Sequence, residues 1–187
     1  VYKIIGKQMG DAMARKKDTD IIALFPSLNG GAEFGADGAN LTLAFASALI
    51  AKAKAGKFGS DLFVVHHPNA IWNLATSVGN TLATYPLPDA FNKPAVKDYY
   101  SGIKLSGVPF FEDGNIAKIG TTDSGYGVIA DKTAMGHLSA SGRTEERERD
   151  ASLRAYEVVV TEDYAVFEVD DSKGAAIRQE ILDPATS

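Results

Sequence analysis

The C-terminal part of the chain begins with Gly102-Ile-Lys-Leu-Ser-Gly-Val-Pro-Phe-Phe-Glu-Asp-Gly-Asn-Ile116, a stretch whose strand-and-turn pattern recurs toward the C-terminus. Ile103 and Leu105 alternate with Lys104 and Ser106, which is the period of a half-buried strand. Further short apolar runs come after it, separated by turn residues. The part of the chain from Gly102 onward is therefore predicted to consist mainly of β-strands.

Three apolar runs near the C-terminus predict an antiparallel meander. Turns between them are expected at Asp163-Tyr164 and at Asp170-Asp-Ser-Lys-Gly174, because Asp, Ser and Gly favour turns. The three predicted strands are Ala155–Val160, Ala165–Val169 and Ala175–Ile181.

The first 24 residues predict a helix with one apolar face. Asp18-Thr-Asp20 is expected to kink or restart this helix, and Pro26 to stop it. The apolar face should pack on the last strands, although the two lie at opposite ends of the chain. The residues expected to meet there are Tyr2, Ile5, Met9 and Met13 on the helix, and Val158, Val160, Val166 and Ile177 on the strands.

The middle of the chain alternates between helical and strand patterns, which suggests a small α/β layer. The Gly-rich stretch Asn29–Gly38 is predicted to be a linker. A helix over Leu41–Ala55 should have Asn40 as its N-cap and Gly56 after its end. The remaining predictions are a strand over Asp61–His66, a helix from Pro68 closed by Gly79 with Trp72 in the core, and a long loop over Asn80–Tyr100.

Composition excludes several classes of protein. The 187 residues carry a net charge of −5, which argues against a surface that grips nucleic acid through its phosphates. The absence of cysteine excludes disulfides and thiolate chemistry. The sequence shows no membrane-spanning run and no secretory signal. Because it opens without Met inside a helical pattern, we expect a processed or partial chain.

The sequence contains no catalytic signature. His66 and His67 would point to opposite faces of a strand, so they cannot share a metal without distortion. No third group with triad or metal-ligand spacing accompanies them or His137. We therefore predict no catalytic residues, no metal and no cofactor.

Two groups of residues are candidates for contacts between subunits. Phe91, Tyr99 and Tyr100 lie in the Pro-rich loop beside charged residues, a mixture of aromatic anchors and rim charges that suits an interface. The second group comes from a run of alternating charge that should lie at the edge between neighbours. Its members are Arg143, Glu145, Arg147 and Arg149.

Taken in order, these segments resemble the major capsid protein of tailed bacteriophages. Val1–Phe25 looks like the end of the spine helix of that family, and Asp61–Trp72 is similar to its strand-turn-helix with a His-Pro. Gly102–Pro109 and Glu145–Tyr156 match its recurrent strand segment and its ending. Similar segments occur over nearly the whole chain. The assignment to the family is made on the C-terminal two-thirds of the chain.

This resemblance implies an α+β chain with the Hong-Kong-97-type capsid fold. Residues 1–39 and 139–187 would form the peripheral P-domain, with the spine helix and antiparallel terminal strands. Residues 40–138 would form a small mixed α/β A-domain near the capsomer centre. The N-terminal arm and the E-loop of the family are not visible before the spine helix.

The resemblance also implies function. The chain would assemble with itself into pentamers and hexamers that form an icosahedral head around double-stranded DNA, touched only weakly and without specificity. Scaffolding, portal and decoration proteins are further partners that it allows, and no membrane is involved. The location would be the virion, after assembly in the host cytoplasm. Two alternatives stay open: a small hydrolase-like α/β enzyme centred on His66, and another virion component such as a tail or decoration protein.

Overall fold

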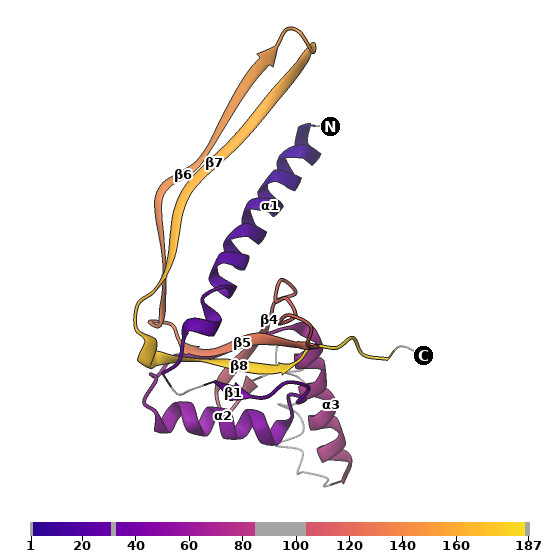
Figure 1. The fold of residues 1–187 in the computed structure, drawn as a ribbon, viewed down its shortest axis with the longest axis vertical. Coiled ribbons are helices and arrows are strands. Elements are labelled where there is room, and N and C mark those ends of the chain that lie inside the picture. The colour runs from indigo at the N-terminus through magenta and orange to yellow at the C-terminus, as the bar shows by residue number, and fades with distance from the viewer. Residues whose placement is uncertain (1, 31–32, 85–103, 186–187) are drawn as a thin grey trace.

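The computed structural model describes residues 2–30, 33–84 and 104–185. The chain has two parts: a central sheet with its helices, and an arm that projects away from it (Figure 1). The arm consists of α1 (Tyr2–Ile22) and the hairpin of β6 (Met135–Asp150) and β7 (Ala155–Glu168). Helices and a mainly antiparallel sheet occur in one chain, so the predicted α+β class is confirmed.

The central sheet has six strands in the order β1-β8-β5-β2-β4-β3. β5 pairs antiparallel with both β2 and β8, whereas β2–β4 and β1–β8 are parallel pairs. β5 and β8 are buried along almost their whole length, as expected of interior strands. The strand bounds are β1 Phe34–Gly35, β2 Leu62–His66, β3 Lys104–Leu105, β4 Val108–Glu112, β5 Ser124–Asp131 and β8 Gly174–Glu180.

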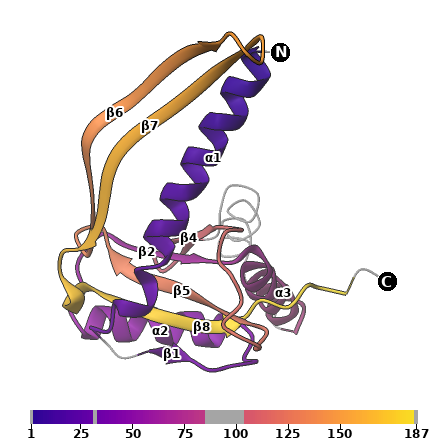
Figure 2. The same ribbon diagram turned by 45° about the horizontal axis from the view of Figure 1, so that its top comes forward.

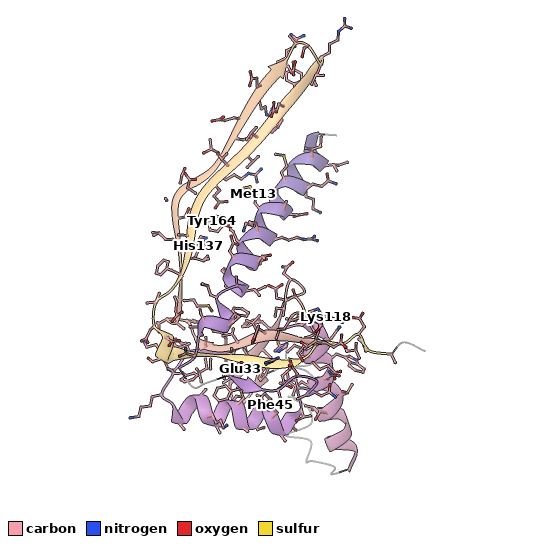
Figure 3. The ribbon with its side chains drawn as sticks, in the orientation of Figure 1. Met13, Glu33, Phe45, Lys118, His137 and Tyr164 are labelled. Atoms are coloured by element: carbon pink, nitrogen blue, oxygen red, sulfur yellow. The ribbon has the colours of Figure 1, made fainter. Side chains whose placement is uncertain are left out.

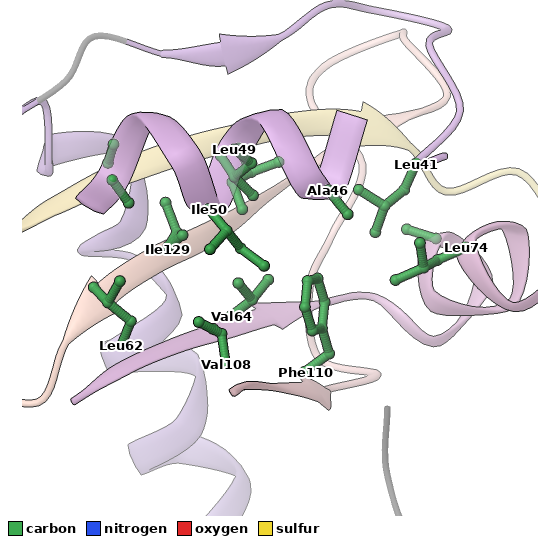
Figure 4. Packing of buried hydrophobic residues seen from close by; sticks show 14 of the residues in the cluster. Leu41, Ala46, Leu49, Ile50, Leu62, Val64, Leu74, Val108, Phe110 and Ile129 are labelled. Atoms are coloured by element: carbon green, nitrogen blue, oxygen red, sulfur yellow. The ribbon is translucent and has the colours of Figure 1, made fainter. Parts of the chain in front are cut away.

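One face of this sheet is covered by α2 (Leu43–Ala55) and α3 (Pro68–Thr84). Leu49 and Ile50 of α2 pack over Val64 of β2, together with its sheet neighbours (Figure 4). The other face is covered by the end of α1 and the short 3-10 turn η1 (Phe25–Ser27), which form a second cluster around Phe25. The sheet is thus sandwiched between the two clusters.

α1 is one continuous helix through Ile22, so the kink predicted at Asp18-Thr-Asp20 is wrong. The side chains of Thr19 and Asp20 form hydrogen bonds that are compatible with the helix, so they do not interrupt its backbone hydrogen bonds. Thr19 donates its hydroxyl to the Arg15 carbonyl at 2.8 Å, within one helical turn, and the Asp20 carboxylate accepts from Lys16 at 2.5 Å. Pro26 lies in η1, just after the helix end that it was predicted to cause.

Both remaining helices differ from prediction at one end. Thr42, not Asn40, caps α2, with its hydroxyl accepting from the Phe45 N–H at 3.3 Å. α3 continues past Gly79 to Thr84, because a single glycine inside a helix costs only about 1 kcal/mol relative to alanine. Trp72 is 46% exposed, which corrects its predicted place in the core.

The predicted C-terminal meander is wrong. Residues 155–168 form the single strand β7, so Asp163-Tyr164 is not a turn. β8 does not pair with β7, because its Ala175, Ala176 and Ile177 are small or branched apolar residues buried on both faces. They fill an interior position beside β5. The predicted turn over Asp170–Gly174 is confirmed as the 3-10 turn η2 (Asp171–Lys173) that leads from the arm to the sheet.

Candidate assembly surface

Polar contacts fasten α1 to the hairpin near the base of the arm, where α1 ends and β7 approaches the central sheet. The Tyr164 hydroxyl donates to the Asp20 carboxylate at 2.6 Å, and Lys17 pairs with Glu162. The Lys17 ammonium also lies 5.6 Å from the centre of the Tyr164 ring. These contacts place the long helix beside β7, as the sequence predicted, but through polar side chains and not by packing of the apolar face. Ile5 is 41% exposed, and Ile177 lies in the central core instead of under α1.

Tyr164 is the residue at the centre of this junction. The hydrogen bond from its hydroxyl to the Asp20 carboxylate stabilises the protonated phenol and raises the pKa of Tyr164 to about 12. The His137 ring stacks on the Tyr164 ring, with centroids 5.7 Å apart (Figure 3). This role was not predicted from sequence, because Asp163-Tyr164 has turn composition. The even-numbered alternation from Val158 to Glu168 was the signal for an uninterrupted strand.

Between this junction and the hairpin tip, α1 and the hairpin form the two sides of the arm (Figure 2). An open groove of about 570 Å³ lies between them. Its floor is apolar, with Ile5 and Met9 from α1 and Val158 and Val160 from β7. Charged residues of β6 and the Tyr156 ring complete its lining. An apolar floor with a charged rim is the usual anatomy of a protein-binding surface.

The structure brings the four predicted charged residues together along this groove. Alternation along β6 places Arg143, Glu145, Arg147 and Arg149 on the face toward α1. Glu145 accepts two hydrogen bonds from Arg147, at 2.6 and 2.8 Å. Among the side chains that the structure describes, no carboxylate lies within 4.0 Å of Arg143 or Arg149. The rim of the groove is therefore basic.

The opposite face of the same hairpin is acidic. In β6 the alternate residues are Glu146, Glu148 and Asp150, and Glu148 lies directly across from Glu157 of β7. The three glutamates are exposed, whereas the Asp150 carboxylate caps the hairpin turn through the amides of the two residues 152 and 153. One strand thus separates charges of opposite sign onto its two faces, a consequence of its period of two.

The structure does not test the other predicted group of subunit contacts, the three aromatic residues. Phe91, Tyr99 and Tyr100 lie outside the residues that the structure describes. Their role at an interface stays a prediction.

His66, the centre of the alternative enzyme hypothesis, is completely buried at the end of β2. Its Nδ1 accepts from the His67 N–H at 2.8 Å, and its Nε2 has no hydrogen-bond partner in the described part of the chain. Burial, with a smaller effect of His67, lowers the pKa of His66 to about 3. Neutral and closed off from solvent, this imidazole is a core residue.

We expect His66 to make folding sensitive to acid. Its pKa rises from about 3 toward 6.5 on unfolding, so the unfolded chain binds more protons between these values. The stability contributed by neutral His66 is complete above pH 6.5 and falls as the pH is lowered through this window. Denaturant unfolding of His66→Leu should show a flatter dependence on pH than the parent protein. The control is His137→Gln at an exposed position. An imidazolium NMR signal from His66 at about pH 6 would contradict this expectation.

The described residues offer neither a metal site nor a membrane span. Within residues 2–30, 33–84 and 104–185, no cluster of three His, Cys, Asp or Glu side chains could hold a metal ion. Over the same ranges, no helix combines the length and the apolar character needed to cross a membrane.

A long helix fastened to a projecting hairpin, beside a mixed sheet with its own helices, defines the class of Hong-Kong-97-type capsid folds. Solved structures share it at low sequence identity. A chain of Mycobacterium phage Che8 superposes with a TM-score of 0.69 at 17% identity, covering 95% of this chain and 63% of that one. A chain of the mature capsid of bacteriophage PhiM1 superposes with a TM-score of 0.60 at 18% identity, covering 98% of this chain and 66% of that one. A chain of an encapsulin complex of Synechococcus elongatus superposes with a TM-score of 0.62 at 11% identity, covering 97% of this chain and 66% of that one.

The chain belongs to the phage capsid protein family, whose sequence profile matches residues 2–177. This family membership identifies a structural protein, not an enzyme centred on His66. The match covers nearly the whole chain and does not single out the C-terminal two-thirds on which the sequence placed the resemblance. The chain spans somewhat less than two-thirds of the length of the first capsid-type structures that it matches. No curated protein sequence matches it.

Proposed function

We propose that this chain builds the shell of a tailed-phage head. Copies assemble into pentamers and hexamers, and these tile a closed icosahedral shell around double-stranded DNA. The observation that carries the proposal is the arm. Every residue of β6 from His137 to Arg149 is exposed, and a two-stranded hairpin has too little burial of its own to be stable alone. Neighbouring copies in a shell would cover that surface.

The two parts of the fold support an assignment to two domains of the capsid fold. We assign α1 and the hairpin to the peripheral domain, and the six-stranded sheet with α2 and α3 to the axial domain. Because β8 pairs with β5, residues 174–180 go with the axial domain, whereas the sequence grouped them with residues 139–169. The central position of the axial domain in the capsomer is part of the proposal.

Other partners are part of the same proposal. With a net charge of −5, contact with packaged DNA would be weak and independent of base sequence. Scaffolding proteins would contact the shell from inside. A portal protein would contact it at one vertex, and decoration proteins from outside. Assembly would occur in the host cytoplasm and the product would be the virion.

Electron microscopy and light scattering of the purified protein test the proposal. Assembled shells, or rings of five and six copies, are the expected result. A well-folded, monodisperse monomer that persists at high concentration would overturn it.

Replacing Tyr99 and Tyr100 together by alanine should impair ring formation more than folding of the monomer. Aromatic anchors account for much of the binding energy at interfaces, and the loop that the sequence predicts at these residues would contribute little to the core. Sedimentation velocity measures the assembled fraction, and circular dichroism checks the fold. The matched control replaces both residues by phenylalanine, which keeps the rings. Equal assembly of the alanine and phenylalanine variants would remove these residues from the interface.

A further inference from the structure

The two faces of the β6–β7 hairpin are complementary to each other in charge. The face toward α1 carries three arginines and one glutamate around an apolar floor. The opposite face carries Glu146, Glu148 and Glu157 around Val159, which is paired with Glu146 and 43% exposed. An arginine rim with an apolar centre thus matches an acidic rim with an apolar centre.

We propose that the groove between α1 and the hairpin binds the acidic hairpin face of a second copy of this chain. Carboxylates of Glu146, Glu148 and Glu157 from that copy would pair with the arginines of the groove. Val159 of the same copy would cover the floor around Met9. The inference rests on the proposed shell function and adds to it the surface by which neighbours recognise each other.

The charge separation also determines the symmetry of the contact. A two-fold contact centred on one face would bring that face of both copies together, so it would set arginine against arginine or glutamate against glutamate. Groove against acidic face is a heterologous contact, in which each copy uses two different surfaces. Such contacts close into rings or continue, whereas the like-charged alternative is disfavoured by repulsion.

Both sets of charges are available for this contact. Among the described side chains, the only carboxylate paired with the groove arginines is Glu145, on Arg147. Over the same part of the chain, Glu146, Glu148 and Glu157 have no cation within 4.0 Å. Each exposed pair adds little alone, but a network across a desolvated interface fixes register and partner choice.

Crosslinking tests the orientation directly, because the parent chain has no cysteine. Arg147→Cys marks the groove and Glu146→Cys marks the acidic face. The two single-cysteine variants are mixed before assembly and treated with a flexible bismaleimide. Crosslinks between the two variants should predominate, with few within either variant. Crosslinks in the statistical ratio, or mainly between identical variants, would overturn the inference even if shells form.

Charge inversion provides a second readout. Arg143→Glu, Arg147→Glu and Arg149→Glu together invert the groove; Glu146→Arg, Glu148→Arg and Glu157→Arg together invert the acidic face. Each triple variant should lose assembly by more than about tenfold, as expected for several close charge pairs. Combining both restores complementarity and the net charge of −5, and should restore assembly.

A matched control separates docking from net charge. Lys57→Glu, Lys104→Glu and Lys132→Glu make the same charge change as the inversion of the groove, but at exposed positions on the central part. This control should assemble like the parent, and an equal loss in it would overturn the inference. If the parent protein itself forms no assembly, it is the proposed function that fails. If the parent assembles and the inverted variants do so equally well, only the docking surface is wrong.

Discussion

Replacing Phe58 by alanine should lower the free energy of unfolding by about 3–5 kcal/mol, the usual cost of removing a buried phenyl ring. Phe58 is 1% exposed and comes directly after α2, where its ring packs closely on Gly56 and joins the cluster between the sheet and its helices. Its N–H donates to the Ala53 carbonyl at 3.2 Å, so the backbone holds the ring at the helix end. A loss of this size is a large part of the roughly 5–15 kcal/mol that stabilises a typical domain.

Phe111→Ala is the matched control for this prediction. Phe111 is the same residue type in the same part of the fold, on β4, but is 54% exposed. Its replacement should change stability by less than about 1 kcal/mol, as surface substitutions usually do. Denaturant unfolding followed by circular dichroism measures both variants. Similar losses in the two variants would show that burial of Phe58 contributes no special stability to the core.

Replacing Gly127 by alanine should destabilise the protein by about 3 kcal/mol through overpacking. Gly127 lies in β5 between β2 and β8, where the His66 ring crosses over it. An added Cβ would lie 2.2 Å from His66 Cδ2 and 2.6 Å from the Val65 carbonyl oxygen. The ring is enclosed by the core and the carbonyl belongs to the sheet, so neither can move away cheaply.

Gly114→Ala tests whether the effect comes from the site. At Gly114, after β4, a Cβ would meet nothing within 4 Å. Thermal unfolding should place this variant within a few degrees of the parent and Gly127→Ala well below it. A Gly127→Ala protein as stable as the parent would mean that β5 and β2 can separate, and that His66 is less tightly enclosed than described.

These two predictions concern the central part, whereas assembly depends on the arm. The central part buries its own two clusters and is stabilised within one chain. The arm is fastened at Tyr164 and Glu162, but its tip, its groove and its acidic face are not covered by any other residue that the structure describes. We therefore expect core variants to reduce folding and arm variants to reduce assembly, so the two classes can be separated by experiment.

Local rules were sufficient for several elements. The period of apolar residues in α1, the strand over Leu62–His66 and the turn over Asp170–Gly174 each depend on neighbours in sequence. The charges of Arg143–Arg149 could also be recognised from sequence as a candidate contact surface. Alternation along a strand is a local property. Once β6 is known to be a strand, the odd positions carry Arg143, Arg147 and Arg149 together with Glu145, and the even positions carry Glu146 and Glu148.

Long-range contacts decided the rest. Asp163-Tyr164 has the composition of a turn, yet it continues β7 because the Tyr164 hydroxyl finds Asp20, 144 residues away in sequence. Ala175–Ile177 could pair with any apolar strand, and only burial on both faces places it beside β5.

The sequence by itself determined the approximate positions of the helices, the strands β2, β3 and β8, and the resemblance to capsid proteins, because these depend on spacing along the chain. Only the tertiary structure decided which strands are neighbours, that His66 is enclosed over Gly127, and that α1 and the hairpin leave a groove between them. The physical reason is that strand partners and cavities depend on which surfaces exclude water together. Such a choice is made among distant segments, and no local pattern contains it.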